Sequence, residues 1–327
     1  MQLGMRLPGP ARHWAAALAL LAAGCQSALG PPPGVGLAVP HATAAAATPP
    51  PAPETLHAAF KLRFVVTADA GTSLVDLTVL VPRDVPRRQT IRKLVWSRAP
   101  DRVFDVGENR YARFLLRDPP PKTVLEAEVE ADIERFDLTR AERERLPVAV
   151  ADAERRAALA ADRYVEVDDP RVRELAAAVT GDTERARIES AFRVVGQALE
   201  HHGYDPGEVG AATTLERGGG DCTDYSDVLV AVLRAQGLAA RSAGGYTLDH
   251  PADTPAHDWV EVLVGGLGWV PLDPLRADLG NATFGELRNI YLRLTVRRND
   301  PLLFGYHYHG YTWDGPGAHV DNELVLP

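Results

Sequence analysis

Cysteine is scarce in this sequence: its 327 residues contain only two, Cys25 and Cys222. Basic residues are also too few to balance the acids, with 35 Lys and Arg against 44 Asp and Glu, and they form no basic stripe. This balance argues against nucleic acid as a partner. No apolar run reaches the roughly 20 residues that a membrane-spanning helix needs, and the sequence has no internal repeat and no glycine-rich phosphate-binding loop. These absences direct attention to the two cysteines and their surroundings.

The first 24 residues have the pattern of an export signal. Arg6 and Arg12 precede a short apolar run at residues 15–23, with no acid among them, and this is typical of a signal peptide. The letters LAAGC then bring small residues up to Cys25 and resemble the lipobox of bacterial lipoproteins. The resemblance implies that Cys25 becomes the lipidated first residue of the mature chain. A plain signal peptide cut nearby, or a buried N-terminal helix, is the alternative.

A tether is predicted behind Cys25. Residues 25–56 are rich in proline and alanine and almost uncharged, which favours a semi-rigid spacer that holds a folded part away from a membrane. The lipobox and Gln26 together indicate a lipoprotein of the bacterial cell envelope, facing the periplasm (in the outer membrane) or the extracellular side. With Cys25 lipidated, Cys222 has no intramolecular disulfide partner.

Strand patterns fill residues 57–136. In LEAEVEADIE, residues 125–134, apolar and acidic residues alternate, as they do in an antiparallel sheet with one solvated face. We therefore predict a small antiparallel β-sandwich here. From residue 137 helical spacing comes first and strands return later, an order that indicates an α+β domain rather than a parallel sheet. We assign this second domain to residues 137–327.

Cys222 stands where a helix is predicted to begin, in GGGDCTDYSDVLVAVLRAQG, residues 218–237. A thiol becomes a strong nucleophile as the thiolate, which a helix N-terminus or a nearby histidine favours. The glycines at 218–220 would let a substrate backbone approach and let N–H groups point at a developing oxyanion. Asp221, Asp224 and Asp227 oppose ionisation of the thiol, but acids also suit a helix N-terminus.

His257 is the candidate base, in PAHDWVEVLVGGLGWVPLDP. If the glycine-rich turn pairs Val264 with Gly268, Asp273 becomes a diagonal neighbour of His257 on the same sheet face. That distance is within reach of a hydrogen bond between imidazole and carboxylate, and a slip of one residue would separate the two.

The blocks around Cys222, HDWVEV and GWVPLDP resemble the three signature blocks of the transglutaminase-like superfamily, in order and in spacing. The resemblance implies a papain-like core in which Cys222 is the nucleophile, His257 the base and Asp273 the orienting acid. Further recurrent motif positions correspond to supporting residues, which are Asp224, Tyr225, Trp259 and Glu261. The family also uses an oxyanion donor upstream of the cysteine, which the sequence does not locate.

Three functions stay open at this point. The first is a thiol hydrolase, a peptidase or amidase that acts on protein or peptide amides outside the cytoplasm. The second is a transglutaminase that cross-links proteins, and the third is a binding module that keeps the fold without catalysis. No cofactor is expected. The histidine pairs at 201–202 and 307–309 lack Cys, Asp or Glu at ligand spacing, so no metal site is predicted.

Overall fold

The computed structural model describes residues 54–144, 150–249, 256–304 and 307–327. The predicted signal peptide, Cys25 and most of the tether lie outside these residues. Within the part of the chain that is described, no helix is long and apolar enough to cross a membrane.

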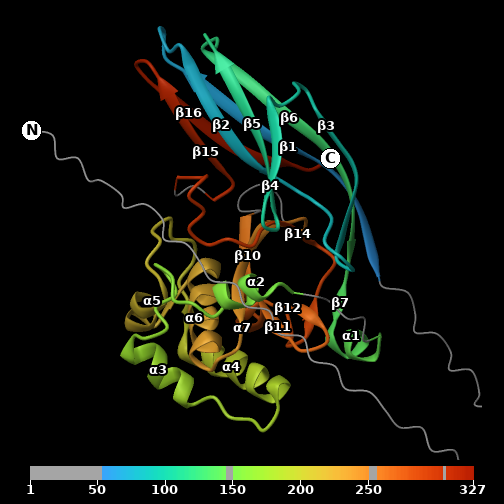
Figure 1. Ribbon diagram of the computed structural model, residues 1–327, viewed down its shortest axis with the longest axis vertical. Coiled ribbons are helices and arrows are strands. Elements are labelled where there is room, and N and C mark those ends of the chain that lie inside the picture. The colour runs from blue at the N-terminus through green and yellow to red at the C-terminus, as the bar shows by residue number, and fades with distance from the viewer. Residues whose placement is uncertain (1–53, 145–149, 250–255, 305–306) are drawn as a thin grey trace, which may run out of the picture. The chain divides into compact units, whose positions relative to one another are not determined.

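Two four-stranded antiparallel sheets form the β-sandwich (Figure 1). One has the order β16-β1-β6-β3 and the other the order β15-β2-β5-β4. Their bounds are β1 Thr55–Ala68, β2 Leu74–Val81, β3 Gln89–Trp96, β4 Arg102–Val106, β5 Asn109–Arg117, β6 Lys122–Glu134, β15 His309–Asp314 and β16 Ala318–Val325. Alternate residues of β1 and β6 are buried in the common core, while the acids of β6 pair with basic side chains such as Arg63 and Lys93. The solvated acidic face is therefore a ladder of cross-strand ion pairs.

The sandwich has a boundary that the sequence did not reveal. Strand β16 pairs with β1, with Val66 opposite Val320, and β15 pairs with β2, with Leu77 opposite Tyr311. The assignment of the whole of residues 137–327 to the second domain was therefore wrong at its C-terminal end. Each sheet would otherwise have an unpaired edge along β1 or β2, and the returning chain covers it.

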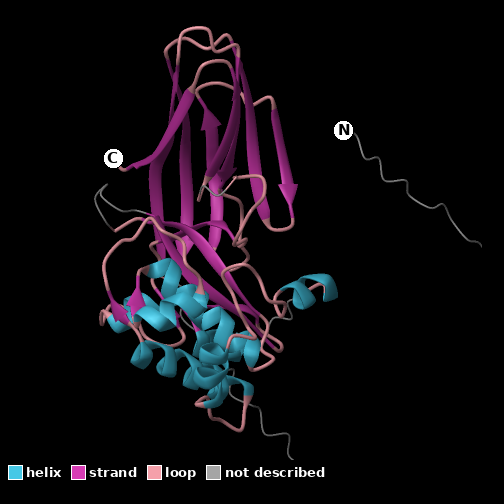
Figure 2. Ribbon diagram, turned by 90° about the vertical axis from the view of Figure 1, so that its left-hand side faces the viewer, coloured by secondary structure: helices cyan, strands magenta, loops and turns pink. Residues whose placement is uncertain are grey.

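The second domain is built on the antiparallel sheet β12-β11-β10-β14. A long helix, α6, packs against β11 and β10 and contacts α3, α4, α5 and α7 (Figure 1). Figure 2 shows the helices, in cyan, gathered around one end of the strands. The bounds are α3 Pro170–Ala177, α4 Glu184–Ala198, α5 Ala211–Arg217, α6 Cys222–Ala235, β10 Ala240–Thr247, β11 Ala256–Val264, β12 Gly268–Leu272, α7 Pro274–Asp278 and β14 Tyr291–Thr295. Every residue of α6 from Asp224 to Leu233 is buried, so this helix is the centre of the core. The α+β class is confirmed.

Shorter elements complete the described chain, with bounds β7 Phe136–Asp137, α1 Leu138–Glu144, α2 Asp152–Ala157, β8 Glu200–His201, β9 Gly219–Gly220 and β13 Glu286–Leu287. The turn between β4 and β5 joins the sandwich to the core sheet. Its Glu108 pairs with Arg241 of β10 and Arg293 of β14 at 2.7 Å each. Asn109 donates to Thr295 Oγ1 at 2.7 Å and accepts from the N–H of Val296 at 3.0 Å. The sandwich thus holds the end of β14, the strand that leads to residues 297–304.

Candidate active site

Cys222 is the first residue of α6 and is half-buried. The helix begins with a capping box: Asp221 accepts from the N–H of Thr223 at 2.9 Å, and Asp224 Oδ2 accepts from the N–H of Asp221 at 3.1 Å. The box satisfies N–H groups that a helix start leaves without partners. It also fixes the backbone on both sides of Cys222, so the thiol is held at the positive end of the helix dipole.

The glycines before Cys222 have an internal role, which corrects the expectation that they make room for substrate. Gly218 ends α5 in the left-handed region, at φ 72°, where glycine is favoured. A Cβ on Gly219 would collide with the carbonyl oxygen of Glu200, and one on Gly220 with the carboxylate of Asp224. The glycines therefore allow β8 and the capping box to lie against the loop. In this way the glycines help to fix the backbone position of Cys222.

His257 and Asp273 meet as predicted. Val264 pairs with Gly268 in the ladder between β11 and β12, so the assumed register is confirmed. His257 Nε2 lies 2.6 Å from Asp273 Oδ2, and both side chains are buried. His257 also forms a hydrogen bond with Cys222, so the imidazole interacts with both the carboxylate and the thiol. This is the order of contacts that a thiol, a base and an orienting acid require.

Tyr291 is a member of the site that the sequence did not indicate. Its hydroxyl donates to Asp273 Oδ2 at 2.6 Å, and its ring lies 5.8 Å from that of His257. The N–H of Arg276 donates to Asp273 Oδ1 at 2.9 Å, because Asp273 is also the N-cap of α7. The Asp273–Pro274 pair is a sequence signal for such a cap. Tyr291 comes from β14, and no local pattern links it to the motif blocks.

The electrostatics of the pair favour a protonated imidazole. Burial alone lowers the pKa of His257, but the charge of Asp273, its hydrogen bond and a hydrogen bond with Cys222 outweigh burial and raise this pKa to about 10. Burial raises the pKa of Asp273, yet the charge of His257 and the hydrogen bonds from His257 and Tyr291 bring it below its usual value. The pKa of Tyr291 is raised by burial and by the charge of Asp273, so its hydroxyl remains a donor.

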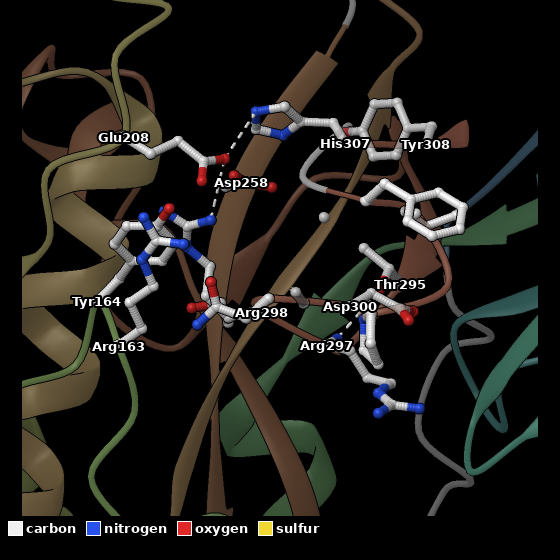
Figure 3. A pocket seen from close by; sticks show the side chains of 17 residues that line it. Arg163, Tyr164, Glu208, Asp258, Thr295, Arg297, Arg298, Asp300, His307 and Tyr308 are labelled. Carbon is white, nitrogen blue, oxygen red and sulfur yellow. Dashed lines mark hydrogen bonds and ion pairs between the residues drawn. The ribbon is translucent and has the colours of Figure 1, made fainter. Parts of the chain in front are cut away.

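A cavity of about 280 Å³ is lined by Asp258, which follows His257 in β11 (Figure 3). One wall carries Glu208, which reaches both Arg298 at 3.1 Å and His307 at 3.4 Å. Arg298 also pairs with the buried Asp227 at 3.1 Å. His307 thus belongs to an ion-pair cluster. Among the described residues, no group of three or more His, Cys, Asp or Glu is arranged to hold a metal ion.

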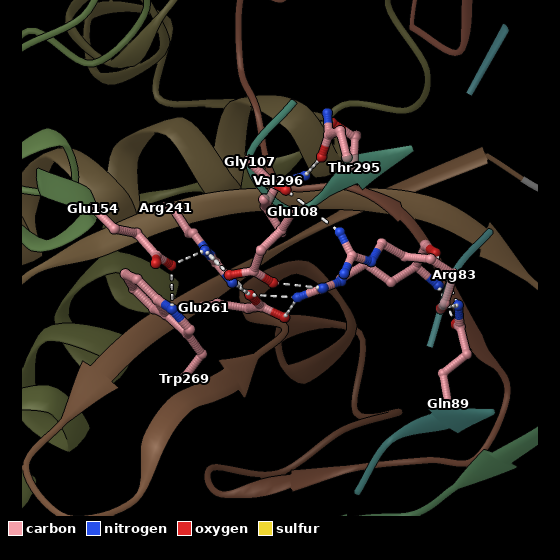
Figure 4. Close-up of polar contacts among 12 residues, drawn as sticks. Arg83, Gln89, Gly107, Glu108, Glu154, Arg241, Glu261, Trp269, Thr295 and Val296 are labelled. Carbon is pink, nitrogen blue, oxygen red and sulfur yellow. Dashed lines mark hydrogen bonds and ion pairs between the residues drawn. The ribbon is translucent and has the colours of Figure 1, made fainter. Parts of the chain in front are cut away.

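The four predicted supporting residues lie in different parts of the structure. Asp224 belongs to the capping box, and the Tyr225 hydroxyl donates to Asp278 at 2.9 Å inside the core. Trp259 is completely buried, with its ring stacked 6.4 Å from that of His257. Glu261 instead binds Arg241 and Arg293 in the buried ion network that joins the core sheet to the sandwich (Figure 4). Of the four, Trp259 is the one whose ring packs against that of His257.

Cys222, His257 and Asp273 therefore lie together at one site. The family model of the transglutaminase-like superfamily matches residues 173–274, a range that contains Cys222, His257 and Asp273. The resemblance seen in the sequence is therefore confirmed for this core.

Solved structures support the fold. A "putative cysteine protease" from Cytophaga hutchinsonii is similar with a TM-score of 0.55 and 18% identity, over 84% of this chain and 99% of that one. The periplasmic domain of TgpA from Pseudomonas aeruginosa also matches, with a TM-score of 0.36 and 19% identity over 68% of this chain and 88% of that one. No curated protein compared with the chain matches it. At 18% identity, the similarity to the Cytophaga hutchinsonii structure shows a common fold.

Proposed function

We propose that this chain is an extracytoplasmic thiol hydrolase that cleaves amide bonds of proteins or peptides through an acyl-enzyme on Cys222. The observation that carries the proposal is the buried contact of His257 with Asp273 at 2.6 Å, formed beside a half-buried cysteine at the start of α6. A binding module has no physical need for a thiol, a base and an orienting acid in this order.

The proposed reaction begins with the thiol proton on His257 and the thiolate of Cys222 attacking an amide carbonyl. The new C–S bond gives a tetrahedral oxyanion, which the backbone N–H of Cys222 would help to stabilise, because the capping box engages the N–H groups of Thr223 and Asp224. His257 then gives its proton to the departing amine as the C–N bond breaks. Water attacks the thioester, its proton passes to His257, and the carboxylic acid leaves as the thiolate is restored. Asp273 and Tyr291 keep the imidazole oriented throughout.

The proposal places the enzyme at the bacterial cell envelope. The support is in the sequence: a basic and apolar segment ends in LAAGC at Cys25, and a proline-rich stretch follows. A lipid on Cys25 would tether the folded part at the membrane surface, facing the periplasm from the outer membrane. Mass spectrometry of Cys25 from membranes of a bacterial host tests this part, because an unmodified Cys25 in a soluble, full-length chain contradicts it.

Product analysis tests the activity. The full-length protein and its Cys222→Ala variant are incubated with a library of natural peptides, and new termini and new cross-links are identified by mass spectrometry. We expect new N-termini that depend on Cys222. Isopeptide bonds between glutamine and lysine would show a transglutaminase instead, and no Cys222-dependent product would leave the binding module as the better account.

A further inference from the structure

Asp258 places a carboxylate beside the proposed nucleophile. It follows His257 in β11, and its Oδ2 accepts from the hydroxyl of Thr223 at 2.8 Å, where Thr223 follows Cys222 in α6. Asp258 is therefore fixed between the two elements that carry the thiol and the base. Its side chain lines the cavity of about 280 Å³, so a substrate bound over Cys222 would have this carboxylate next to it.

No lysine, arginine or histidine of the described chain forms an ion pair with Asp258. Thr223 is its single hydrogen-bond donor, and Asp258 forms no ion pair among the described residues. The charge of Arg298 reaches Asp258, but Arg298 is already bound by Asp227 and Glu208 at 3.1 Å each. A partly buried carboxylate without a cation is electrostatically costly.

A glycine on the neighbouring strand leaves room for Oδ1 of Asp258. Gly244 lies directly opposite Asp258 in the ladder between β10 and β11. A Cβ at Gly244 would collide with Asp258 Oδ1. The absence of a side chain there leaves Oδ1, which has no hydrogen-bond partner among the described residues, at the wall of the cavity.

A second unpartnered group lines the same cavity. Ser242 is 8% exposed, and its hydroxyl has no hydrogen-bond partner among the described residues. It stands two residues before Gly244 on the same face of β10 and is therefore a diagonal neighbour of Asp258. Buried hydroxyls are nearly always hydrogen-bonded. Oδ1 of Asp258 and the buried hydroxyl of Ser242 are thus two polar groups at one cavity wall that have no partner among the described residues.

We propose that this wall binds a primary ammonium group of the substrate. An ammonium has three N–H donors and a compact charge, which suits one carboxylate oxygen and one hydroxyl. A guanidinium prefers a carboxylate with both oxygens free, and one oxygen of Asp258 is engaged by Thr223. The substrates are then peptides with an ammonium, from a side chain or a terminus, close to the cleaved amide. This inference rests on the proposed function, since it places the substrate over Cys222.

The ammonium is bound as a recognition group and not as the attacking amine. A nearby carboxylate favours the charged form of an amine, and a protonated nitrogen has no lone pair with which to attack a thioester. Occupation of this wall therefore selects the substrate that is cleaved, while water remains the acyl acceptor.

Charged alkylating reagents test the site without a known substrate. The full-length chain with Cys25→Ser has Cys222 as its single thiol. Its rates of alkylation by neutral iodoacetamide and by the cationic N-(2-aminoethyl) iodoacetamide are compared at fixed ionic strength. We expect the cationic reagent to be favoured about fivefold, as for one partly exposed ion pair, and Asp258→Asn to bring the ratio of the two rates to about one. Ser242→Ala should lower the ratio by a smaller factor. The exposed Asp182 gives the matched control, because Asp182→Asn removes the same charge away from the cavity and should leave the ratio unchanged.

The outcomes separate this inference from the proposed function. A ratio near one in the parent chain, or one that neither Asp258→Asn nor Ser242→Ala changes, overturns the ammonium site. Slow alkylation of Cys222 by neutral iodoacetamide, at a rate that does not depend on His257, overturns the proposed thiol-enzyme function. This holds whatever the ratio of the two alkylation rates is. Cadaverine added with p-nitrophenyl acetate tests the role of the amine: inhibition that requires Asp258 supports recognition. Formation of N-acetylcadaverine that requires Asp258 would assign the wall to an acyl acceptor and contradict the inference.

Discussion

Replacing Asp273 by asparagine removes the charge that controls the base. The pKa of His257 is raised from 6.5 to about 10, with Asp273 as the largest cause that raises it. A difference of this size corresponds to on the order of 5 kcal/mol in favour of the imidazolium. Asparagine keeps the shape of the side chain but carries no charge, and burial lowers the pKa of a histidine. We therefore expect the pKa of His257 in Asp273→Asn to fall below 6.5.

Nitrogen NMR of the imidazole and alkylation kinetics measure the two consequences. At about pH 7, His257 should carry both ring protons in the parent protein and one in the variant. The rate of Cys222 alkylation by iodoacetamide should fall by at least about tenfold, because a neutral imidazole stabilises the thiolate less. Thermal unfolding shows whether the variant is folded. A folded variant that retains a doubly protonated His257 and the parent rate would refute the assignment of Asp273.

Three further perturbations probe the surroundings of the pair. Tyr291→Phe removes a hydroxyl that donates to Asp273, so urea titration should show a loss of about 1.5–3 kcal/mol in the free energy of unfolding; a loss near zero would contradict this role. Glu261→Gln leaves Arg241 and Arg293 without one buried carboxylate partner and should lower the free energy of unfolding by about 3–5 kcal/mol. The rate of Cys222 alkylation in the folded variant should change little. A large loss in that rate would place Glu261 in the active site. Because the folded-state pKa of His257 is raised, its contribution to stability is complete below about pH 6.5, the unfolded value, and is lost as the pH rises to about 10. Urea titrations across this range should show a decline that His257→Ala removes.

The sequence was informative where a contact depends on neighbours in the chain. The turn between β11 and β12 fixes a two-strand register, so the meeting of His257 with Asp273 could be worked out from Val264 and Gly268. The start of α6 at Cys222 could likewise be predicted from the sequence, because Asp221 and Asp224 are local capping residues.

Contacts between distant segments were not predictable in this way. Tyr291 reaches Asp273 from β14, and β15 and β16 join the sandwich across most of the chain length. Nothing in the spacing of apolar residues shows which strand edge a C-terminal strand will cover. Glu261 illustrates the same limit, because its motif position suggested the site while its partners come from β10 and β14.

The most direct test of the central claim is the pH dependence of Cys222 alkylation by iodoacetamide in the full-length Cys25→Ser chain, with and without His257→Ala. The account predicts rapid alkylation at about pH 6, where an ordinary thiol is almost entirely protonated, and a loss of at least about tenfold when His257 is replaced. A thiol that reacts only above about pH 8, at the same rate in both proteins, would contradict the account.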